Sequence, residues 1–213
     1  MIHNIVYPQG FVYIRIICII ASNNSTANLL RDAGCKDVQI EPELLPVNPS
    51  KFKKRTNTQP GARLDVSARG VWSQFERSFY DIRVTHPNCL SNIGKPVADI
   101  YVEHQKAKKS EYEERVLQSE KASFTPLVFT TSGGMGPECT IFYKQIAELS
   151  SSRKNEHYGS VMNYIRTRLR FAILRSTLIG IRGERGKSKS RYDVSLDEIS
   201  LNLIPSANAY ECI

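Results

Sequence analysis

Two acidic residues stand among apolar neighbours in segments that alternate in the manner of β-strands. Asp65 lies in ARLDVSARGVW and Asp81 in ERSFYDIRVTHP, and a short turn at residues 72–75 predicts that the two segments pair antiparallel. A buried carboxylate without a partner costs on the order of several kcal/mol, and two of them on adjacent strands repel each other. A divalent cation relieves both effects, and oxygen ligands favour Mg²⁺, or Mn²⁺, with a substrate phosphate completing the coordination.

Two basic residues accompany this acidic pair. A strand places alternate side chains on one face, so Arg83 shares a face with Asp81 and can reach the same phosphate. Residues 97–119 predict a helix whose inward stripe consists of Val97, Tyr101, His104, Lys108, Tyr112 and Arg115. Lys108 thus completes an acid, acid, lysine set. Phosphodiester cleavage needs such a set, because a metal polarises the phosphate and a cation stabilises the added negative charge.

An ordinary structural role is the alternative for both acids. Asp65 would then pair with Arg63 or Arg69, and Asp81 with Arg83, as ion pairs at the edge of a sheet. The inward lysine of the helix favours the catalytic interpretation.

Four weaker signals have alternatives of their own. Glu41 is either an upstream acidic residue of such a site or a solvent-facing residue at a proline-rich turn, and His104 is either a satisfied core histidine or a base. The sequence GGMG predicts a strand-to-helix turn, since no GK[ST] follows as a phosphate-binding loop requires. His86 and Cys89 have a metal-like spacing, but two ligands do not make a zinc site.

The first half of the chain supplies the elements that precede the strand pair. Residues 23–34 predict a short helix that ends at Gly34. The segment CKDVQIEPELLPV alternates polar and apolar residues until prolines interrupt it, and residues 48–61 predict a flexible basic linker.

The second half supplies a strand and two helices. Residues 124–132 form a dense apolar run that predicts a central strand covered on both sides, and GGMGPE begins a helix that continues through ECTIFYKQIAELS. A last helix is expected over about 158–181, with arginines on one face. The order of elements predicts an α/β fold with a mixed central sheet flanked by helices.

Size and charge set broader limits. The 213 residues, 41% hydrophobic, predict one domain with appendages, and the net charge of +8 gathers in basic runs at 51–55, 106–110 and 182–191. These runs suit a polyanion, although basic runs also serve solubility. Five scattered cysteines without CxxC spacing predict a reducing, intracellular setting. The apolar segment 5–22 is interrupted and too short to span a bilayer, so no membrane role is expected.

At these residues the chain resembles a known class of nuclease. Asp65, then Asp81-Ile82-Arg83, then a helix with a lysine, is similar to the PD-(D/E)XK restriction-like endonuclease core in the variant whose lysine lies on the following helix. Longer phrases resemble the segment downstream of reverse transcriptases in animal retroelement-type proteins, and these are GARLDVSARGVW, FERSFYDIRVTHP, HQKAKKSEYEERV, FTPLVFTTSGGMGPE and YIRTRLRFAILRSTLIGIRG.

The resemblance implies a restriction-endonuclease-like core over residues 27–185, after a leader at 1–26 and before a basic and polar tail at 186–213. It implies metal-dependent nicking of DNA, in the nucleus, that primes reverse transcription, with RNA as a second possible ligand. Asp65 and Asp81 would be metal ligands, Lys108 the catalytic lysine with Tyr112 as its support, and Lys109 the alternative lysine. Apart from the resemblance, the arginines of the last helix either contact phosphate or cover the apolar face of that helix with their stems. The residues predicted to contact phosphate are Lys109, Arg166, Arg170, Arg175 and Lys187.

Two departures from that family pattern affect the expected function. Arg83 stands where a lysine is usual, and an arginine stabilises a transition state but does not act as a base. No YxDD-like polymerase motif occurs, so a reverse transcriptase would act in trans or belong to a parent element. A catalytically inactive nucleic-acid-binding relic, or a domesticated fragment, is therefore the alternative to an active nuclease.

Overall fold

A mixed four-stranded sheet forms the centre of the computed structural model, which describes residues 22–183. Its strands are β1 (Lys36–Ile40), β2 (Val66–Arg69), β3 (Arg77–Thr85) and β4 (Ser123–Thr130), in the spatial order β1-β2-β3-β4. β2 runs antiparallel to both β1 and β3, and β4 runs parallel to β3. The predicted α/β fold with a mixed sheet is confirmed.

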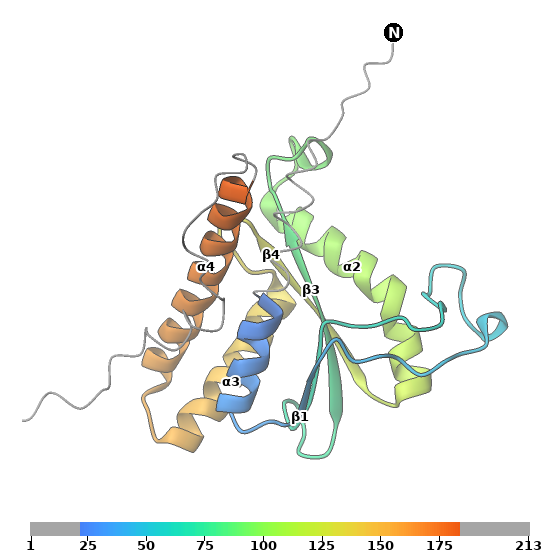
Figure 1. The fold of residues 1–213 in the computed structure, drawn as a ribbon, viewed down its shortest axis with the longest axis horizontal. Helices are drawn as coiled ribbons and strands as arrows, with labels where there is room; N and C mark the ends of the chain where they lie inside the picture. The colour runs from blue at the N-terminus through green and yellow to red at the C-terminus, as the bar shows by residue number, and fades with distance from the viewer. Residues whose placement is uncertain (1–21, 184–213) are drawn as a thin grey trace, which may run out of the picture.

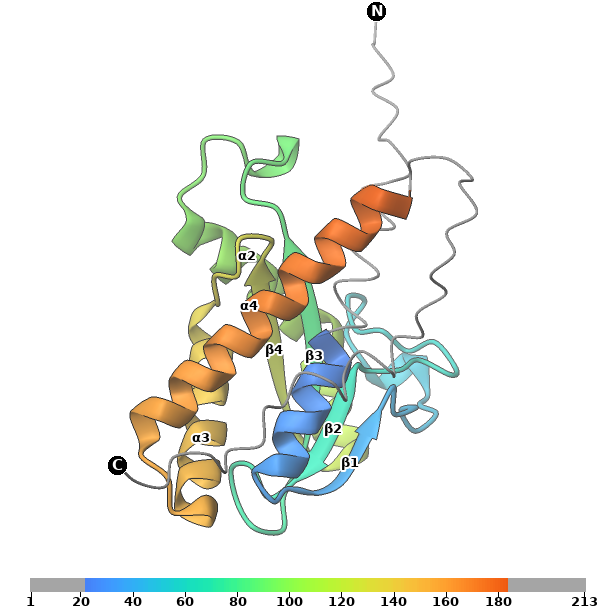
Figure 2. The same cartoon turned by 60° about the vertical axis from the view of Figure 1, so that its left-hand side comes forward.

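Helices cover both faces of this sheet. They are a helix at residues 22–32, α2 (Val97–Arg115) with a π-helical extension (Val116–Glu120), α3 (Pro137–Lys154) and α4 (Tyr158–Gly183). Figure 1 shows α2 on one side of the strands and the other three helices on the opposite side, and Figure 2 shows α4 crossing that second side diagonally. No helix within residues 22–183 is long and apolar enough to cross a membrane.

The parallel pairing of β3 and β4 explains why α2 lies over the sheet. Parallel neighbours need a long crossover connection, and α2 is that connection. The antiparallel pairing of β2 and β3, predicted from the sequence, is confirmed, with Val66 opposite Tyr80. The crossover therefore carries residues of α2 back over the strand pair that holds both acids.

Strand β3 packs against apolar side chains on both of its faces. Tyr80 and Ile82 belong to the larger core, formed with α3, α4 and the helix at 22–32, while Phe79 packs with Tyr112 and Val116 on the α2 side. Asp81 comes two residues after Phe79, so the alternation of a strand places it on the α2 side. A carboxylate therefore occupies a position that packing would give to an apolar residue.

The apolar run at 124–132 forms the last strand of the sheet, so its expected central position is wrong. Its residues are nevertheless buried on both faces, as expected. The edge of β4 away from β3 is covered by the following turn, in which Met135 bridges to Phe129 and the Gly136 amide donates to the Val128 carbonyl at 2.9 Å. Burial on two faces makes a strand apolar wherever it stands in the sheet, so the run could not reveal its position.

Two segments before β2 differ from their expected states. β1 adds a strand to the predicted order, and pairs with β2 through an irregular register. Residues 48–61, expected to be a flexible linker, contain a short 3₁₀ helix (Pro49–Lys51) and are fixed to α2 by hydrogen bonds from Arg115.

The turn between β4 and α3 allows a test of close packing. Gly133 has φ +81°, and a Cβ there would lie 2.8 Å from Arg170 Cγ of α4, whereas Gly94 has φ +79° with nothing within 4 Å. We expect Gly94→Ala to cost about 1 kcal/mol, the price of the left-handed backbone, and Gly133→Ala about 2–3 kcal/mol. Chemical denaturation of both variants measures the difference. Equal losses would mean that Arg170 moves aside at no cost.

Candidate functional site

Asp81 forms the centre of the candidate site. It lies in β3, is only 6% exposed, and faces Lys108 of α2. Lys108 Nζ donates to Asp81 Oδ1 at 3.2 Å and lies 3.0 Å from Oδ2, in poor alignment for a second hydrogen bond. Asp81 Oδ2 is thus a buried oxygen that accepts no hydrogen bond from the described residues.

Asp65 lies at the bend that leads into β2. The paired register of β2 with β3 ends at Val66 opposite Tyr80. Beyond it, Oδ2 of Asp65 accepts a hydrogen bond from the backbone amide of Ile82 in β3 at 2.5 Å. Its Oδ1 accepts from Asn23 Nδ2, of the helix at 22–32, at 3.0 Å. The carboxylate of Asp65 is therefore held next to the strand position that follows Asp81.

Burial raises the pKa values of both acids. Burial raises the pKa of Asp81 to about 6, against the attraction of Lys108 and with a further contribution from Asp65. Burial also raises the pKa of Asp65, although hydrogen bonds from Ile82 and Asn23, and the charge of Lys108, lower it. Because Asp65 acts on Asp81, and Lys108 acts on both, the three groups share one electrostatic site.

Lys108 is held in place by three neighbours. Besides Asp81, its Nζ lies 3.6 Å from Glu111 Oε2 and 5.2 Å from the centre of the Tyr112 ring. Burial favours the neutral amine, but Asp81 and Glu111 outweigh it, so the pKa of Lys108 is raised. The lysine is therefore a fixed cation, and Tyr112 lies where a supporting residue was expected.

Lys109, the alternative lysine, faces a different part of the molecule. Its Nζ lies 2.8 Å from Glu138 Oε1 at the start of α3, and 3.9 Å from Glu113 Oε1. The structure therefore brings Lys108, and not Lys109, to the acidic pair.

The arginines offered as structural partners of Asp65 pair with other acids. Arg63 Nη2 lies 4.0 Å from Glu43 Oε2, and Arg69 Nε lies 3.3 Å from Asp37 Oδ2. Both of these pairs are solvent-exposed, in contrast to the buried pair of Asp81 and Lys108. Asp81 does form an ion pair, and its partner is Lys108.

Arg83 follows Asp81 on the α2 side of β3. The pKa of the exposed Glu103 in α2 is lowered by its hydrogen bond and ion pair with Lys95 and, to a smaller extent, by Arg83. The guanidinium therefore influences the first half of α2, while Lys108 lies in the second half.

The residues behind the weaker sequence signals make structural contacts. Glu41 is exposed, and it is linked to the site through its amide, which donates to the Asp65 carbonyl at 2.8 Å. His104 Nε2 lies 3.1 Å from Thr85 Oγ1, the arrangement of a satisfied core histidine. His86 Nδ1 accepts from the amide of Asn88.

The donor set fits a hard cation with a small number of protein ligands. Within residues 22–183 no group of three or more His, Cys, Asp or Glu residues is close enough to hold a metal. Mg²⁺ keeps several waters and is often held by one or two carboxylates together with substrate phosphate, so Asp65 and Asp81 suffice in number. The Asp81 Oδ2 atom has lone pairs to offer such an ion.

Two amide side chains at the site were not identified from the sequence. Asn23 donates to Asp65, and Asn57 Nδ2 donates to Tyr112 Oη at 3.2 Å. They come 42 residues before Asp65 and 55 before Tyr112, in segments without periodicity that would single them out.

The arginines of α4 lie on the other side of the sheet from Lys108. Arg166 and Arg170 are exposed and Arg175 is half-buried, while Arg168 Nη1 lies 3.8 Å from Asp32 Oδ2. α4 and α2 cover opposite faces of the sheet (Figure 1), and the ion pairs of Asp81 and Lys108 involve none of these arginines. Lys187 lies outside the described residues.

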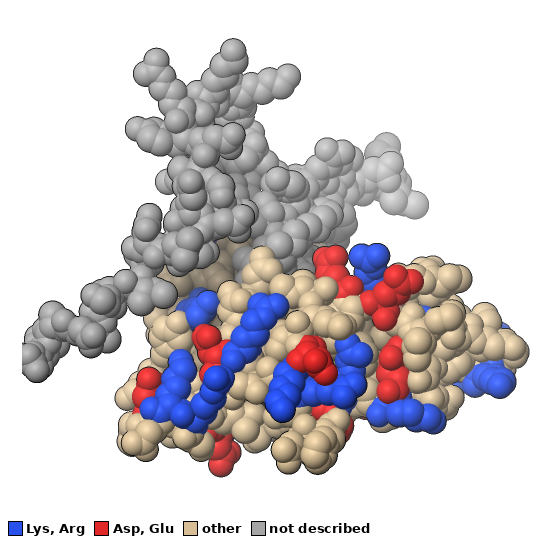
Figure 3. Space-filling model, turned by 60° about the horizontal axis from the view of Figure 1, so that its bottom comes forward, with Lys and Arg blue, Asp and Glu red and all other residues tan. Residues whose placement is uncertain are grey.

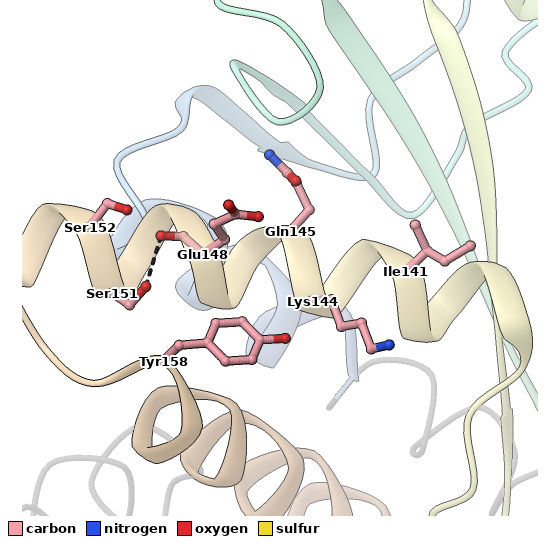
Figure 4. A pocket seen from close by; sticks show the side chains of 7 residues that line it. All are labelled: Ile141, Lys144, Gln145, Glu148, Ser151, Ser152 and Tyr158. Atoms are coloured by element: carbon pink, nitrogen blue, oxygen red, sulfur yellow. Dashed lines mark hydrogen bonds between the residues drawn. The ribbon is translucent and has the colours of Figure 1, made fainter.

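Two further views show one face of the surface and a groove away from the candidate site. Figure 3 shows basic and acidic side chains interleaved on one face, without a continuous positive field. The groove in Figure 4 lies along α3 and is lined by Ile141, Lys144, Gln145, Glu148, Ser151, Ser152 and Tyr158. None of the three central residues of the candidate site lines this groove.

Comparison with known proteins adds no independent assignment. Neither the family models nor the curated proteins with which the chain was compared gave a match.

Proposed function

We propose that the chain is a metal-dependent DNA endonuclease domain that nicks one strand, of the restriction-like type found in retroelement proteins. One observation carries the proposal. Asp81 is almost fully buried, its pKa is raised to about 6, and it faces both Lys108 and a second carboxylate. The sequence resemblance at the same residues supports the choice of reaction and of DNA as substrate.

Each residue has a role in this proposal. Asp65 and Asp81 would hold a divalent cation, Mg²⁺ or Mn²⁺, and such an ion would polarise the scissile phosphate and lower the pKa of a bound water. Lys108 lies 3.0 Å from Asp81 and contributes the positive charge that stabilises the negative charge developing on the phosphate. The Tyr112 ring, which lies below that amine, restricts its position. Arg83 serves as a second cation.

The energetic balance of the acidic pair favours function over structure. A lysine beside a carboxylate ordinarily lowers the pKa of that group. The pKa of Asp81 is raised even though Lys108 lies beside it. Ionised Asp81 therefore destabilises the fold, and Asp65 adds to the cost. Such arrangements gather at functional sites, because a bound cation and phosphate compensate the buried charge.

A nucleic-acid-binding domain without catalysis is the second candidate. Two observations favour it: Lys108 already neutralises Asp81, and no group of three or more possible metal ligands occurs within residues 22–183. Cleavage separates the two candidates, since both would bind DNA.

The two adjacent lysines provide the test of the proposed function. We expect the purified protein to nick supercoiled plasmid with Mg²⁺ and not with EDTA, and Lys108→Met to lower the nicking rate about a hundredfold because the site loses its cation. Lys109→Met is the matched control and should retain the wild-type rate within about threefold. Absence of Mg²⁺-dependent nicking by the wild type, or equal losses in the two variants, would refute the assignment.

A further inference from the structure

A basic segment lies beside the candidate site on the α2 side of the sheet. We call residues 49–59 the basic arm. It contains four cationic side chains within five residues, all exposed, at Lys51, Lys53, Lys54 and Arg55. Figure 1 shows this part of the chain next to the C-terminal half of α2. Its positive charge therefore lies beside the half of α2 that also carries Lys108.

Hydrogen bonds fix the arm to α2 along the turn that follows Lys108. The Asn57 amide donates to the Glu111 carbonyl at 2.8 Å, and Thr56 Oγ1 donates to Glu114 Oε2 at 2.9 Å. Asn57 Nδ2 donates to the hydroxyl of Tyr112, whose ring contacts Lys108. The arm thus has a defined position relative to the site.

Buried Arg115 anchors the same segment from below. Its Nη1 donates to the carbonyls of Asn57 at 2.8 Å and Gln59 at 3.1 Å, and its Nη2 to the carbonyl of Leu45 at 2.9 Å. Burial of a guanidinium is costly, and three carbonyl acceptors partly offset it. The backbone that carries the exposed basic side chains of the arm is therefore anchored by Arg115.

We propose that the basic arm binds the phosphate backbone of DNA and leads it to the pair of Asp81 and Lys108. This inference rests on the proposed function and adds the position of the substrate. The arm is favoured over α4 because α4 lies across the sheet from the site. Lys53 Nζ is 3.9 Å from Glu114 Oε1 and its side chain is 83% exposed, so this weak pair leaves the amine accessible to phosphate.

A second variant controls for the loss of positive charge alone, because it removes the same number of charges from another part of the surface. The arm variant carries four substitutions, Lys51→Gln, Lys53→Gln, Lys54→Gln and Arg55→Gln. The control removes four exposed charges from other parts of the surface through Arg31→Gln, Lys36→Gln, Lys144→Gln and Lys154→Gln. Anisotropy of a labelled duplex of about 30 base pairs in EDTA, over a range of salt concentrations, measures binding without cleavage. Single-stranded DNA, RNA and phosphatidylserine vesicles are assayed alongside.

We expect the arm variant to lose at least about tenfold in duplex affinity near 0.1 M salt. The slope of the logarithm of its binding constant against the logarithm of the salt concentration should also fall, by an amount that corresponds to about three phosphate contacts. The control should lose less than about threefold. Equal losses in both variants, an unchanged arm variant, or stronger arm-dependent binding to vesicles or RNA than to DNA would overturn the inference. Because binding is read in EDTA, a protein that binds through the arm but never nicks refutes the proposed function and leaves the arm intact.

Discussion

Asp81→Asn is expected to abolish nicking and at the same time to stabilise the folded protein. An amide cannot supply the charge that holds a divalent cation, so the nicking rate should fall about a thousandfold or more. Asparagine has the shape of the protonated acid, and the buried site already disfavours the ionised form. The free energy of unfolding at pH 7.5 should therefore rise, by on the order of 2–3 kcal/mol at most, for a carboxyl whose pKa is raised from 3.8 to about 6.

The pH dependence has a definite sign. Between the unfolded pKa of 3.8 and the folded pKa of about 6, the folded protein holds the Asp81 proton more tightly than the unfolded chain does. The Asp81 contribution to stability is therefore most favourable at low pH and falls as the pH rises through this window. Urea denaturation of wild type and Asp81→Asn from pH 4 to pH 7.5 should show a difference that grows with pH. Asp65 has a raised pKa in both proteins and largely cancels from the difference.

The opposite result would identify a structural pair. If Asp81→Asn loses 3 kcal/mol or more at pH 7.5, the carboxylate stabilises Lys108 as an ordinary buried ion pair. Addition of Mg²⁺ gives a second reading, because a cation that binds the ionised acids should raise the melting temperature of the wild type and not that of the variant.

Arg115→Met is expected to cost about 3–5 kcal/mol of folding free energy. The side chain is fully buried, and its guanidinium donates to three main-chain carbonyls in the segment that precedes β2. Methionine fills much of the same volume but leaves those acceptors without partners in a buried place. Chemical denaturation measures the loss, and trypsin should cleave the released basic arm faster than it cleaves the wild type.

Exposed Arg69 provides the comparison for this substitution. It lies 3.3 Å from Asp37 with both side chains about half exposed, so Arg69→Met should cost less than about 1 kcal/mol. A loss below 1 kcal/mol in Arg115→Met as well would mean that the arm is held mainly by Thr56 and Asn57.

The strand pair and the inward lysine followed from periodicity in the sequence. Alternation predicted both acids on paired strands; Asp81 does lie in β3, while Asp65 lies at the bend one residue before β2. The 3.6-residue period placed Lys108 on the stripe that faces Asp81. The predicted inward stripe is wrong at its first residue. Val97 is the first residue of α2 and is 45% exposed, because the helix begins there beyond the packed part of the sheet. Local patterns indicate which face of an element is buried, because residues three or four positions apart lie on the same face of a helix and alternate residues on the same face of a strand.

The tertiary structure decided what those patterns leave open. It selected Lys108 over Lys109, because only the first lies above Asp81 when α2 crosses from β3 to β4. It also placed β4 at the end of the sheet, fixed a presumed linker through Arg115, and put the arginines of α4 on the face away from the site. These outcomes depend on contacts between residues more than 25 positions apart, and the geometry that joins them is set by the packing of whole elements.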